Sequence, residues 1–196
     1  VLEPGDMLYL PPRYAHDGVA EGECMTYSIG FRAPARQELA QELLVRLAED
    51  AGEEEAALLY RDAKQEAVDT PAAIPAQLQA FAREALARAL SQPLVLERAL
   101  GEYLTEPKPS VWFEPGDVGV MLEGVRLDRR SRMMYDTHHV FINGESYRAA
   151  GRDATLMRRL ADERQLTARE LARASDDALE LLSQWCDAGW AHAWAG

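Results

Sequence analysis

The sequence is poor in cysteine, lacks long apolar runs and lacks several common catalytic motifs. Its 2 cysteines, Cys24 and Cys186, are too few for a disulfide framework, so we expect both thiols to be reduced and buried. No apolar stretch approaches the ~20 residues of a membrane span, and no signal-like segment opens the chain. The absence of a phosphate-binding loop, a nucleophile elbow and a CxxC pair excludes the enzyme classes that depend on them. We therefore expect a cytoplasmic protein that has no membrane partner.

Positive charge is scarce relative to negative charge. The chain carries 33 acidic and 21 basic side chains, for a net charge of −12 at pH 7. Residues 35–115 alone hold 15 acidic and 8 basic side chains. Such a chain is repelled by the phosphate backbone of nucleic acids and is attracted to basic partners. Its 47% hydrophobic and 28% charged residues are typical of a globular protein.

The opening residues predict a turn, a short strand and a rigid proline corner that leads to one histidine. The turn is expected at Gly5 and the strand over residues 7–10, and a second strand is expected over residues 25–31. His16 then lies at the start of the connection between two strands. A rigid corner fixes the direction of an imidazole, which metal ligation requires. An ordinary surface histidine in a proline-rich turn is the alternative interpretation.

The spacing of Gly5, Pro11 and His16 resembles the second motif of the cupins. The sequence Gly-Phe-Arg-Ala-Pro at residues 30–34 resembles the narrower JmjC-type group called ribosomal oxygenases. In that family the histidine that matches His16 is the last ligand of a two-His-one-carboxylate iron site. An upstream H-x-D motif supplies the other two ligands, and no H-x-D precedes His16 here. Arg13 stands where many cupins have glycine, which favours the JmjC-type resemblance over a generic cupin.

This resemblance implies an Fe(II)- and 2-oxoglutarate-dependent dioxygenase that hydroxylates a large-subunit ribosomal protein, at an arginine in bacterial members. Iron held by three protein ligands keeps positions open for 2-oxoglutarate and dioxygen. Thr26 and Ser28 share one face of the second expected strand and are candidate contacts to 2-oxoglutarate, with ordinary barrel-lining residues as the alternative. Since His16 is the one ligand found, we expect these residues to be the C-terminal part of a longer enzyme and to be inactive alone.

The pattern becomes helical after residue 34. Apolar residues recur at helical spacing, and helices are expected over residues 37–51, 53–64, 76–91 and 94–104, with a loop over residues 67–75. Apolar stripes of this kind bury against one another or against a second copy of the chain. We expect a homodimer formed through this region, as in the family that the chain resembles.

Residues 109–196 combine short strands with three helices, an order that resembles a winged-helix domain. Strands are expected over residues 118–127, 133–135, 140–142, 145–147 and 189–194, and helices over residues 154–162, 167–174 and 176–188. Thr167 and Glu170 form a capping-box pattern, and Ser175 is placed to cap the last helix. The predicted fold class is therefore α+β: barrel strands in residues 1–34, a helical dimerisation region in residues 35–108 and a winged helix in residues 109–196.

Asp136, His138 and His139 form a second group of potential metal ligands. Side chains of this kind on a short turn can bind a metal ion, but no further carboxylate or cysteine follows nearby in the sequence. A polar turn between two strands is the interpretation that we favour.

Arg158, Arg159 and Arg164 form a modest basic group in the expected winged helix, and acidic residues lie close to them in sequence. A DNA-reading helix requires a basic patch, so duplex DNA is not an expected partner. The alternative to an oxygenase is a non-catalytic, dimeric cupin and winged-helix binding module. Capture of a basic ribosomal protein would favour the oxygenase, whereas retention of duplex DNA would favour a regulator.

Overall fold

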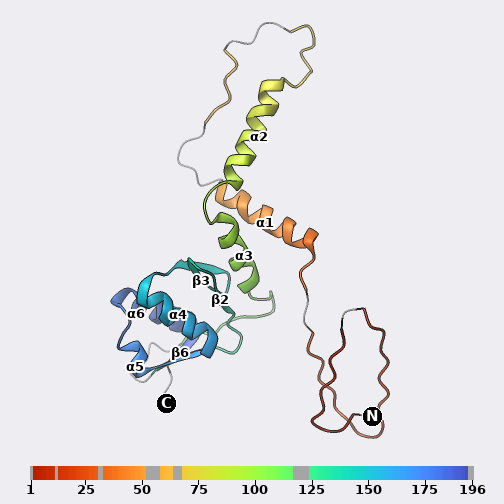
Figure 1. Cartoon of the computed structure of the whole chain (residues 1–196), viewed down its shortest axis with the longest axis vertical. Helices are drawn as coiled ribbons and strands as arrows, with labels where there is room; N and C mark the ends of the chain where they lie inside the picture. Colours follow the sequence, from red (N-terminus) through yellow and green to blue (C-terminus); the bar gives the residue numbers. More distant parts are fainter. Residues whose placement is uncertain are drawn as a thin grey trace. The chain divides into compact units, whose positions relative to one another are not determined.

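The computed structural model describes residues 2–11, 13–30, 33–51, 58–63, 68–116 and 124–193 (Figure 1). The chain divides into two units, Val1–Pro34 and Ala35–Gly196. The predicted division into three domains, with a second boundary at residue 108, stays a prediction. Among the described residues, no helix has the length and apolar character needed to cross a membrane.

The first unit consists of turns and irregular backbone in its described residues. The N–H of Asp6 donates to the carbonyl of Glu3 over 3.0 Å, which confirms the turn at Gly5. The strands predicted over residues 7–10 and 25–31 are wrong for this structure, since no strand forms at residues 7–10 or 25–30, and Phe31 lies outside the described residues. A strand persists only where its backbone groups find partners in a sheet. Met7 and Tyr27 accordingly stay 90% and 83% exposed.

The second unit begins with three helices, α1 (Arg36–Ala51), α2 (Ala76–Leu90) and α3 (Val95–Thr105), which confirms three of the expected helices. The helix predicted over residues 53–64 does not form at residues 58–63, and its other residues lie outside the described part. Instead of continuing a helix, Tyr60 places its ring 5.6 Å from that of Phe81 in α2. Residues 68–75 form the expected loop, while Ala67 lies outside the described residues.

Two small antiparallel sheets and three further helices occupy the described residues 124–193. One sheet has the order β5-β1-β6 and the other β2-β3-β4. The strands are β1 (Gly124–Leu127), β2 (Met133–Tyr135), β3 (His139–Ile142), β4 (Glu145–Arg148), β5 (Gln165–Thr167) and β6 (Ala191–Ala193). The helices are α4 (Gly151–Glu163), α5 (Ala168–Leu171) and α6 (Asp176–Asp187). Most predicted elements of this region are confirmed, although residues 118–123 and Trp194 lie outside the described part. The helix predicted over residues 167–174 is shorter, Ala168–Leu171, and the strand β5 before it was not predicted.

Local sequence signals set the ends of these elements. Asn143 and Gly144 adopt φ angles of 50° and 92°, which is the backbone that a two-residue hairpin turn requires. The Glu170 carboxylate accepts the N–H of Thr167 over 2.9 Å, so the capping box is present. The Ser175 hydroxyl accepts the N–H of Ala178 over 3.2 Å at the start of α6. The turn and both caps therefore confirm the sequence predictions.

One hydrophobic core lies between the sheets and the helices α4 to α6. Its fully buried side chains include Val125, Val140, Ile142, Leu160, Leu166, Leu182 and Trp185. Cys186 is buried there as expected, and burial raises the pKa of its thiol to about 11. Cys24 is exposed, so the expectation that it is buried is wrong, because the described residues of the first unit form no core around it.

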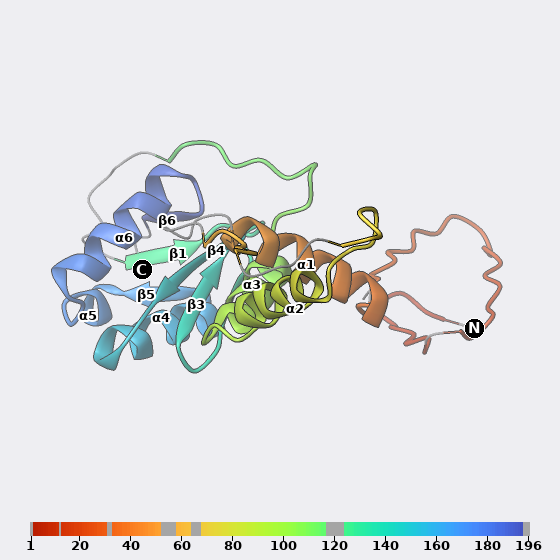
Figure 2. The ribbon, with the colours of Figure 1, turned by 90° about the horizontal axis from the view of Figure 1, so that it is seen from above.

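Helix α3 packs directly on the β2-β3-β4 sheet (Figure 2). Gly101 faces the ring of Phe141, and a Cβ at this position would overlap that ring. The buried hydroxyl of Thr105 accepts the N–H of Gly144 over 3.1 Å, and the Ser146 hydroxyl donates to Glu102 over 2.6 Å. An apolar contact and two polar contacts therefore hold α3 in one register on the sheet.

We predict that Gly101→Ala destabilises the second unit by about 1–3 kcal/mol, because overpacking of a close contact costs that much. Alanine in a helix interior is otherwise favoured over glycine by about 0.5–1 kcal/mol. A decrease in the free energy of unfolding would therefore show that the added methyl group clashes with Phe141. Urea unfolding of the single variant and of Gly101→Ala combined with Phe141→Leu measures it. The smaller side chain at position 141 should recover part of the loss. A single variant that is more stable than the wild type would contradict this packing.

Candidate functional site

His16 lies in the first unit, on exposed irregular backbone. Its Nδ1 is 3.3 Å from the carbonyl oxygen of Tyr14. Since a carbonyl only accepts, Nδ1 carries the proton in this contact, and the lone pair of Nε2 is left for a ligand. A backbone hydrogen bond on one ring nitrogen is the usual way to orient a metal-binding histidine through the other. This geometry suits His16 as one metal ligand.

Thr26 and Ser28 are exposed and lie on irregular backbone, not on a strand. In the described residues no hydrogen bond joins either of them to His16, so their contact with a cosubstrate stays a prediction. The part of the chain that the structure describes also contains no group of three or more His, Cys, Asp or Glu residues arranged to hold a metal ion. A facial triad needs two ligands besides His16. These residues therefore fit one position of an iron site and do not complete it.

Asp136 forms the polar turn that we favoured over a metal site. Its Oδ1 accepts the backbone N–H groups of His138 and His139, each over 2.6 Å. Burial opposes ionisation of the carboxyl, but these two N–H groups lower its pKa below the ordinary value. The ring of His139 is buried 5.6 Å from that of Phe141. Asp136 thus ends β2 and fixes the turn into β3.

The three arginines that were grouped as a potential DNA-reading face have three different sets of partners. Arg158 donates to the carbonyls of Asp136 and Thr137 over 3.2 and 2.9 Å. Arg159 forms an ion pair with the capping residue Glu170. Arg164 reaches the turn between β1 and β2. The structure therefore does not bring the three guanidinium groups together on one helical face.

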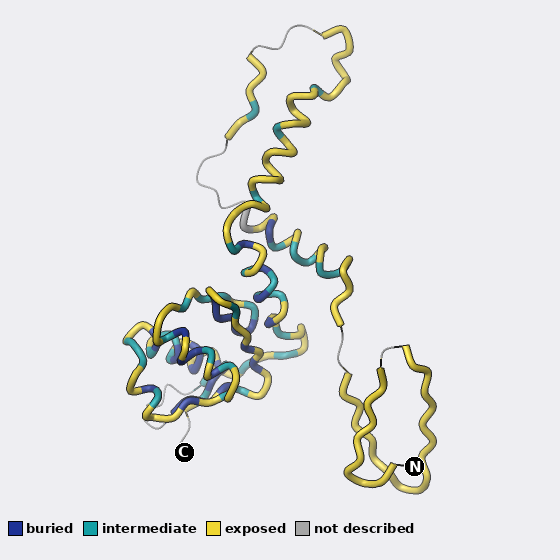
Figure 3. Tube along the Cα trace, viewed as in Figure 1, coloured by how far each residue is buried: buried dark blue, intermediate teal, exposed yellow. Residues whose placement is uncertain are grey.

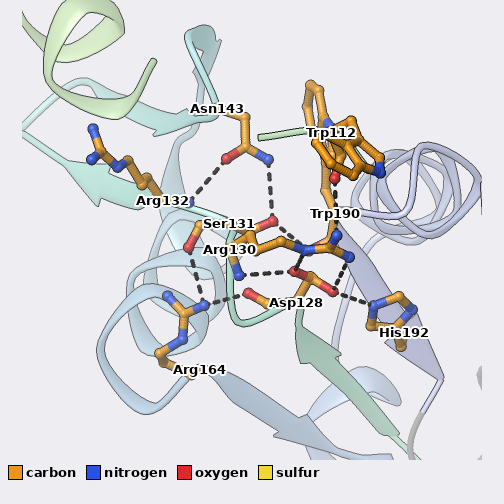
Figure 4. Close-up of polar contacts among 9 residues, drawn as sticks. All are labelled: Trp112, Asp128, Arg130, Ser131, Arg132, Asn143, Arg164, Trp190 and His192. Carbon is orange, nitrogen blue, oxygen red and sulfur yellow. Dashed lines mark hydrogen bonds and ion pairs between the residues drawn. The ribbon is translucent and has the colours of Figure 1, made fainter. Parts of the chain in front are cut away.

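A second candidate site, which sequence reasoning missed, is centred on Asp128 at the end of β1 (Figure 4). Its Oδ1 accepts the backbone N–H and the Nε of Arg130 over 2.8 and 2.9 Å. Its Oδ2 lies 2.9 Å from Nε2 of His192, which must donate because a carboxylate only accepts. The Arg130 guanidinium holds the pKa of the Asp128 carboxyl well below its usual range, and the contact with His192 lowers it further although burial opposes both.

A wider network fixes this turn. Nη2 of Arg164 donates to the carbonyls of Asp128 and Ser131 over 2.6 and 3.0 Å. The Asn143 amide donates to the Ser131 hydroxyl over 3.1 Å, and that hydroxyl donates to the Trp190 carbonyl over 2.8 Å. Figure 4 shows these contacts converging on the turn from α4, the β3-β4 hairpin and the C-terminal residues. The turn is therefore preorganised by residues distant in the sequence.

The signal for this network in the sequence was weak. The charged run over residues 128–132 indicates only a turn, and Asp128 meets His192 across 64 residues. Arg164 has a φ of 63°, an uncommon conformation for a residue other than glycine, which aims its side chain at this turn. The direction of the Arg164 side chain depends on the folded backbone, so no local sequence pattern predicts it.

Comparison with known proteins agrees with the order of these parts. Residues 1–39, which include His16, match the JmjC domain family. Residues 87–192 match the family described as ROXA-like winged helix, over more than half of the chain. The class defined by the two matches is a JmjC-type protein with an appended winged helix. The chain belongs to the ribosomal oxygenase family that carries the ROXA-like winged helix, which confirms the resemblance seen in residues 3–34.

Two relatives and two solved structures illustrate the similarity. The chain is 29% identical to the ribosomal protein uL16 3-hydroxylase of Escherichia coli K12 over 211 residues, 96% of this chain and 52% of the relative. It is 59% identical over 34 residues to a probable ribosomal oxygenase of Haemophilus influenzae, which covers 17% of this chain and 8% of the relative. The chain therefore spans about half the length of the first relative.

The crystal structure of E. coli YcfD matches 83% of this chain and 46% of its own, with a TM-score of 0.64 and 22% identity. YcfD in complex with cobalt and 2-oxoglutarate matches 83% and 47%, with a TM-score of 0.58 and 23% identity. At these identities the similarity establishes the fold, and it confirms the predicted α+β class.

We predict that Asp128→Asn lowers the free energy of unfolding by about 1.5–3 kcal/mol at pH 7, the range for hydrogen bonds to charged groups. Because the folded-state pKa of Asp128 lies below its unfolded value of about 4, its contribution is complete above pH 4 and is lost as the pH falls below that value. The difference between wild type and variant should therefore shrink between pH 7 and pH 2. Urea unfolding across this range measures it, with exposed Asp69→Asn as the control. A difference that does not change with pH would contradict this role.

Proposed function

We propose that this chain is part of an Fe(II)- and 2-oxoglutarate-dependent oxygenase that hydroxylates a large-subunit ribosomal protein, at an arginine side chain. The observation that carries the proposal is the match of residues 1–39 to the JmjC domain, because this segment contains His16. Two further findings support it: one relative is named for hydroxylation of ribosomal protein uL16, and YcfD was solved with cobalt and 2-oxoglutarate.

In this proposal His16 holds the metal ion through Nε2, while its Nδ1–H remains on the Tyr14 carbonyl. The iron and 2-oxoglutarate supply the oxidising chemistry when bound. Thr26 and Ser28 carry hydroxyl groups that can donate to a 2-oxoglutarate carboxylate once residues 25–31 are paired in a complete barrel. The protein's further task is to orient the substrate and to exclude water.

The negative net charge of the chain supports the proposal that its substrate is basic. The chain carries a net charge of −12, and residues 35–115 hold 15 acidic against 8 basic side chains. A surface of this sign attracts a basic partner, raises the association rate and makes that rate fall with salt. A ribosomal protein that binds RNA phosphates through arginine and lysine has the complementary charge.

We predict that the isolated 196 residues neither retain iron tightly nor consume 2-oxoglutarate, because one imidazole makes too few bonds for a stable site. The same protein extended upstream to include an H-x-D motif should bind one iron and add one oxygen to its substrate. Metal analysis, succinate release and the mass of a purified large-subunit ribosomal protein are the measurements. The position of the new oxygen, mapped by fragmentation, tests the arginine assignment separately.

The matched variants for this experiment are His16→Ala and His138→Ala in the extended protein. His16→Ala should lower iron occupancy and turnover at least a hundredfold, whereas His138→Ala, at an exposed turn in the second unit, should change neither. Full turnover by the His16 variant, or tight iron in the isolated chain, would exclude this role. Retention of a basic ribosomal protein without turnover would favour the non-catalytic binding module.

We further infer that the chain forms a homodimer through α2. This helix has no buried residue, and Figure 3 shows it exposed along most of its length. Leu78, Leu86 and Leu90 lie on one face of α2, and Leu86 is 67% exposed. Leu44 of α1 adds a further exposed apolar side chain. An amphipathic helix whose leucine stripe is exposed indicates a partner surface, and a second copy of the chain presents the same stripe.

We predict that Leu78→Glu combined with Leu86→Glu raises the dimer dissociation constant at least about a hundredfold, because each new carboxylate would be buried without a partner. Gln77→Glu combined with Ala80→Glu adds the same charge on the opposite face of α2, at two exposed positions, and should leave the dimer intact. Sedimentation velocity over a range of protein concentrations measures both. A wild-type chain that is monomeric at every concentration tested would rule out the dimer.

A further inference from the structure

A cavity of about 310 Å³ lies on the winged-helix domain, next to the Asp128 turn, and is lined only by residues of the second unit. It is lined by Arg126, Leu127, Asp128, Arg129, Arg164 and His192. Three of these six side chains are guanidinium groups, and one is a carboxylate. The cavity is therefore a local concentration of positive charge in a chain whose net charge is −12.

The register of the β5-β1-β6 sheet explains how the cavity forms. Val125 and Leu127 point into the core, so Arg126 between them faces solvent. Arg126 lies opposite Gln165 on β5 and opposite His192 on β6. Side chains directly opposite in a ladder share one face of the sheet. Polar residues from all three strands therefore meet on the exposed face, where Arg129 and Arg164 add two more guanidinium groups at the end of β1.

The positive charge of the cavity is not cancelled by its own residues. Both oxygens of Asp128 are engaged, by Arg130 and by His192. In the described part of the chain, Arg126 and Arg129 form no ion pair and no side-chain hydrogen bond. Arg164 uses only Nη2, and its partners are neutral carbonyls. The guanidinium groups of Arg126 and Arg129 are thus available to an anion that enters the cavity.

The arrangement of donors favours phosphate over carboxylate. A carboxylate is planar and pairs with one guanidinium in a two-point contact, whereas a phosphate presents oxygens in several directions. Here the guanidinium groups come from the middle of β1, from the turn after it and from the end of α4. Donors that approach from several directions suit the tetrahedral group.

An exposed tryptophan is connected to the Asp128 turn through Arg130. The indole of Trp112 is 69% exposed, and its backbone carbonyl accepts Nη1 of Arg130 over 3.0 Å. Figure 4 shows Arg130 between Trp112 and Asp128. Proteins that bind single-stranded nucleic acids combine guanidinium groups for the phosphates with aromatic rings on which bases stack. We propose that this surface, defined by Arg126, Arg129, Arg164 and Trp112, binds a short single-stranded RNA segment through one phosphate and one stacked base.

The charge balance limits how much RNA is bound. Residues 124–193 hold 11 arginines and 11 acidic residues, so this region is neutral while the remainder of the chain is acidic. A long RNA tract would be repelled by that remainder, whereas a contact restricted to the cavity is not. For single strands the slope of log K against log salt is about −0.7 for each phosphate contacted. A slope between about −0.7 and −1.4 is therefore expected for one or two phosphates.

The test uses the complete 196-residue chain and a fluorescein-labelled single-stranded RNA of about eight nucleotides, within the usual site size for such contacts. Fluorescence anisotropy measures binding. Arg126→Gln combined with Arg129→Gln should weaken it at least tenfold, since each contact to a charged group is lost. Trp112→Ala should weaken it about fivefold or more. Arg173→Gln removes an exposed arginine outside the cavity and should leave binding unchanged, with thermal melting confirming that all variants fold.

Three results would overturn the proposal: no binding by the wild-type chain, equal binding by the double arginine variant, and a salt slope far steeper than that for two phosphates. Competition separates the possible sources of the anion. Unlabelled RNA should displace the probe at concentrations at which inorganic phosphate does not. Equal displacement by inorganic phosphate, or by a polyglutamate peptide, would assign the cavity to a free anion or to an acidic protein and would refute an RNA site.

Discussion

The contact between Gly101 and Phe141 is the constraint on which the second unit depends. With no side chain at Gly101, α3 approaches the β2-β3-β4 sheet closely enough for Thr105 to reach the backbone of the β-hairpin. Arg46 of α1 in turn pairs with Glu106, directly after α3. Helix α3 therefore packs on the sheet, and α1 is connected to the sheet through its contacts with α3.

The elements that sequence reasoning predicted well are those fixed by neighbouring residues. The apolar residues from which α1, α2 and α3 were predicted recur at the helical period. The turn at Asn143 and Gly144 depends only on the conformational freedom of those two residues. Strands are different, because their stability resides in partners elsewhere in the chain. The two strands expected before residue 34 have suitable apolar residues but no ladder to join among the described residues.

The candidate sites divide in the same way. His16 was found because a proline corner and a motif spacing are local features of the sequence. The Asp128 network was not found, since Asp128, Arg164 and His192 meet only after α4 and β6 have folded onto β1. Conversely, Arg158, Arg159 and Arg164 looked like one group because they are close in sequence. Neighbouring helical positions point in different directions, so proximity along the chain did not become proximity in space.

The burial of Trp185 gives the winged helix a distinct tryptophan fluorescence signal. Its indole is almost fully enclosed, packs edge-on against Tyr147 at 5.5 Å and has no hydrogen-bond partner for Nε1 among the described residues. Emission from such an indole is shifted to the blue, whereas an exposed ring such as that of Trp112 emits further to the red. Residues 1–34 contain tyrosines but no tryptophan. Intrinsic fluorescence excited at the red edge of the tryptophan band therefore reports on the second unit alone, and residues 1–34 do not contribute to it.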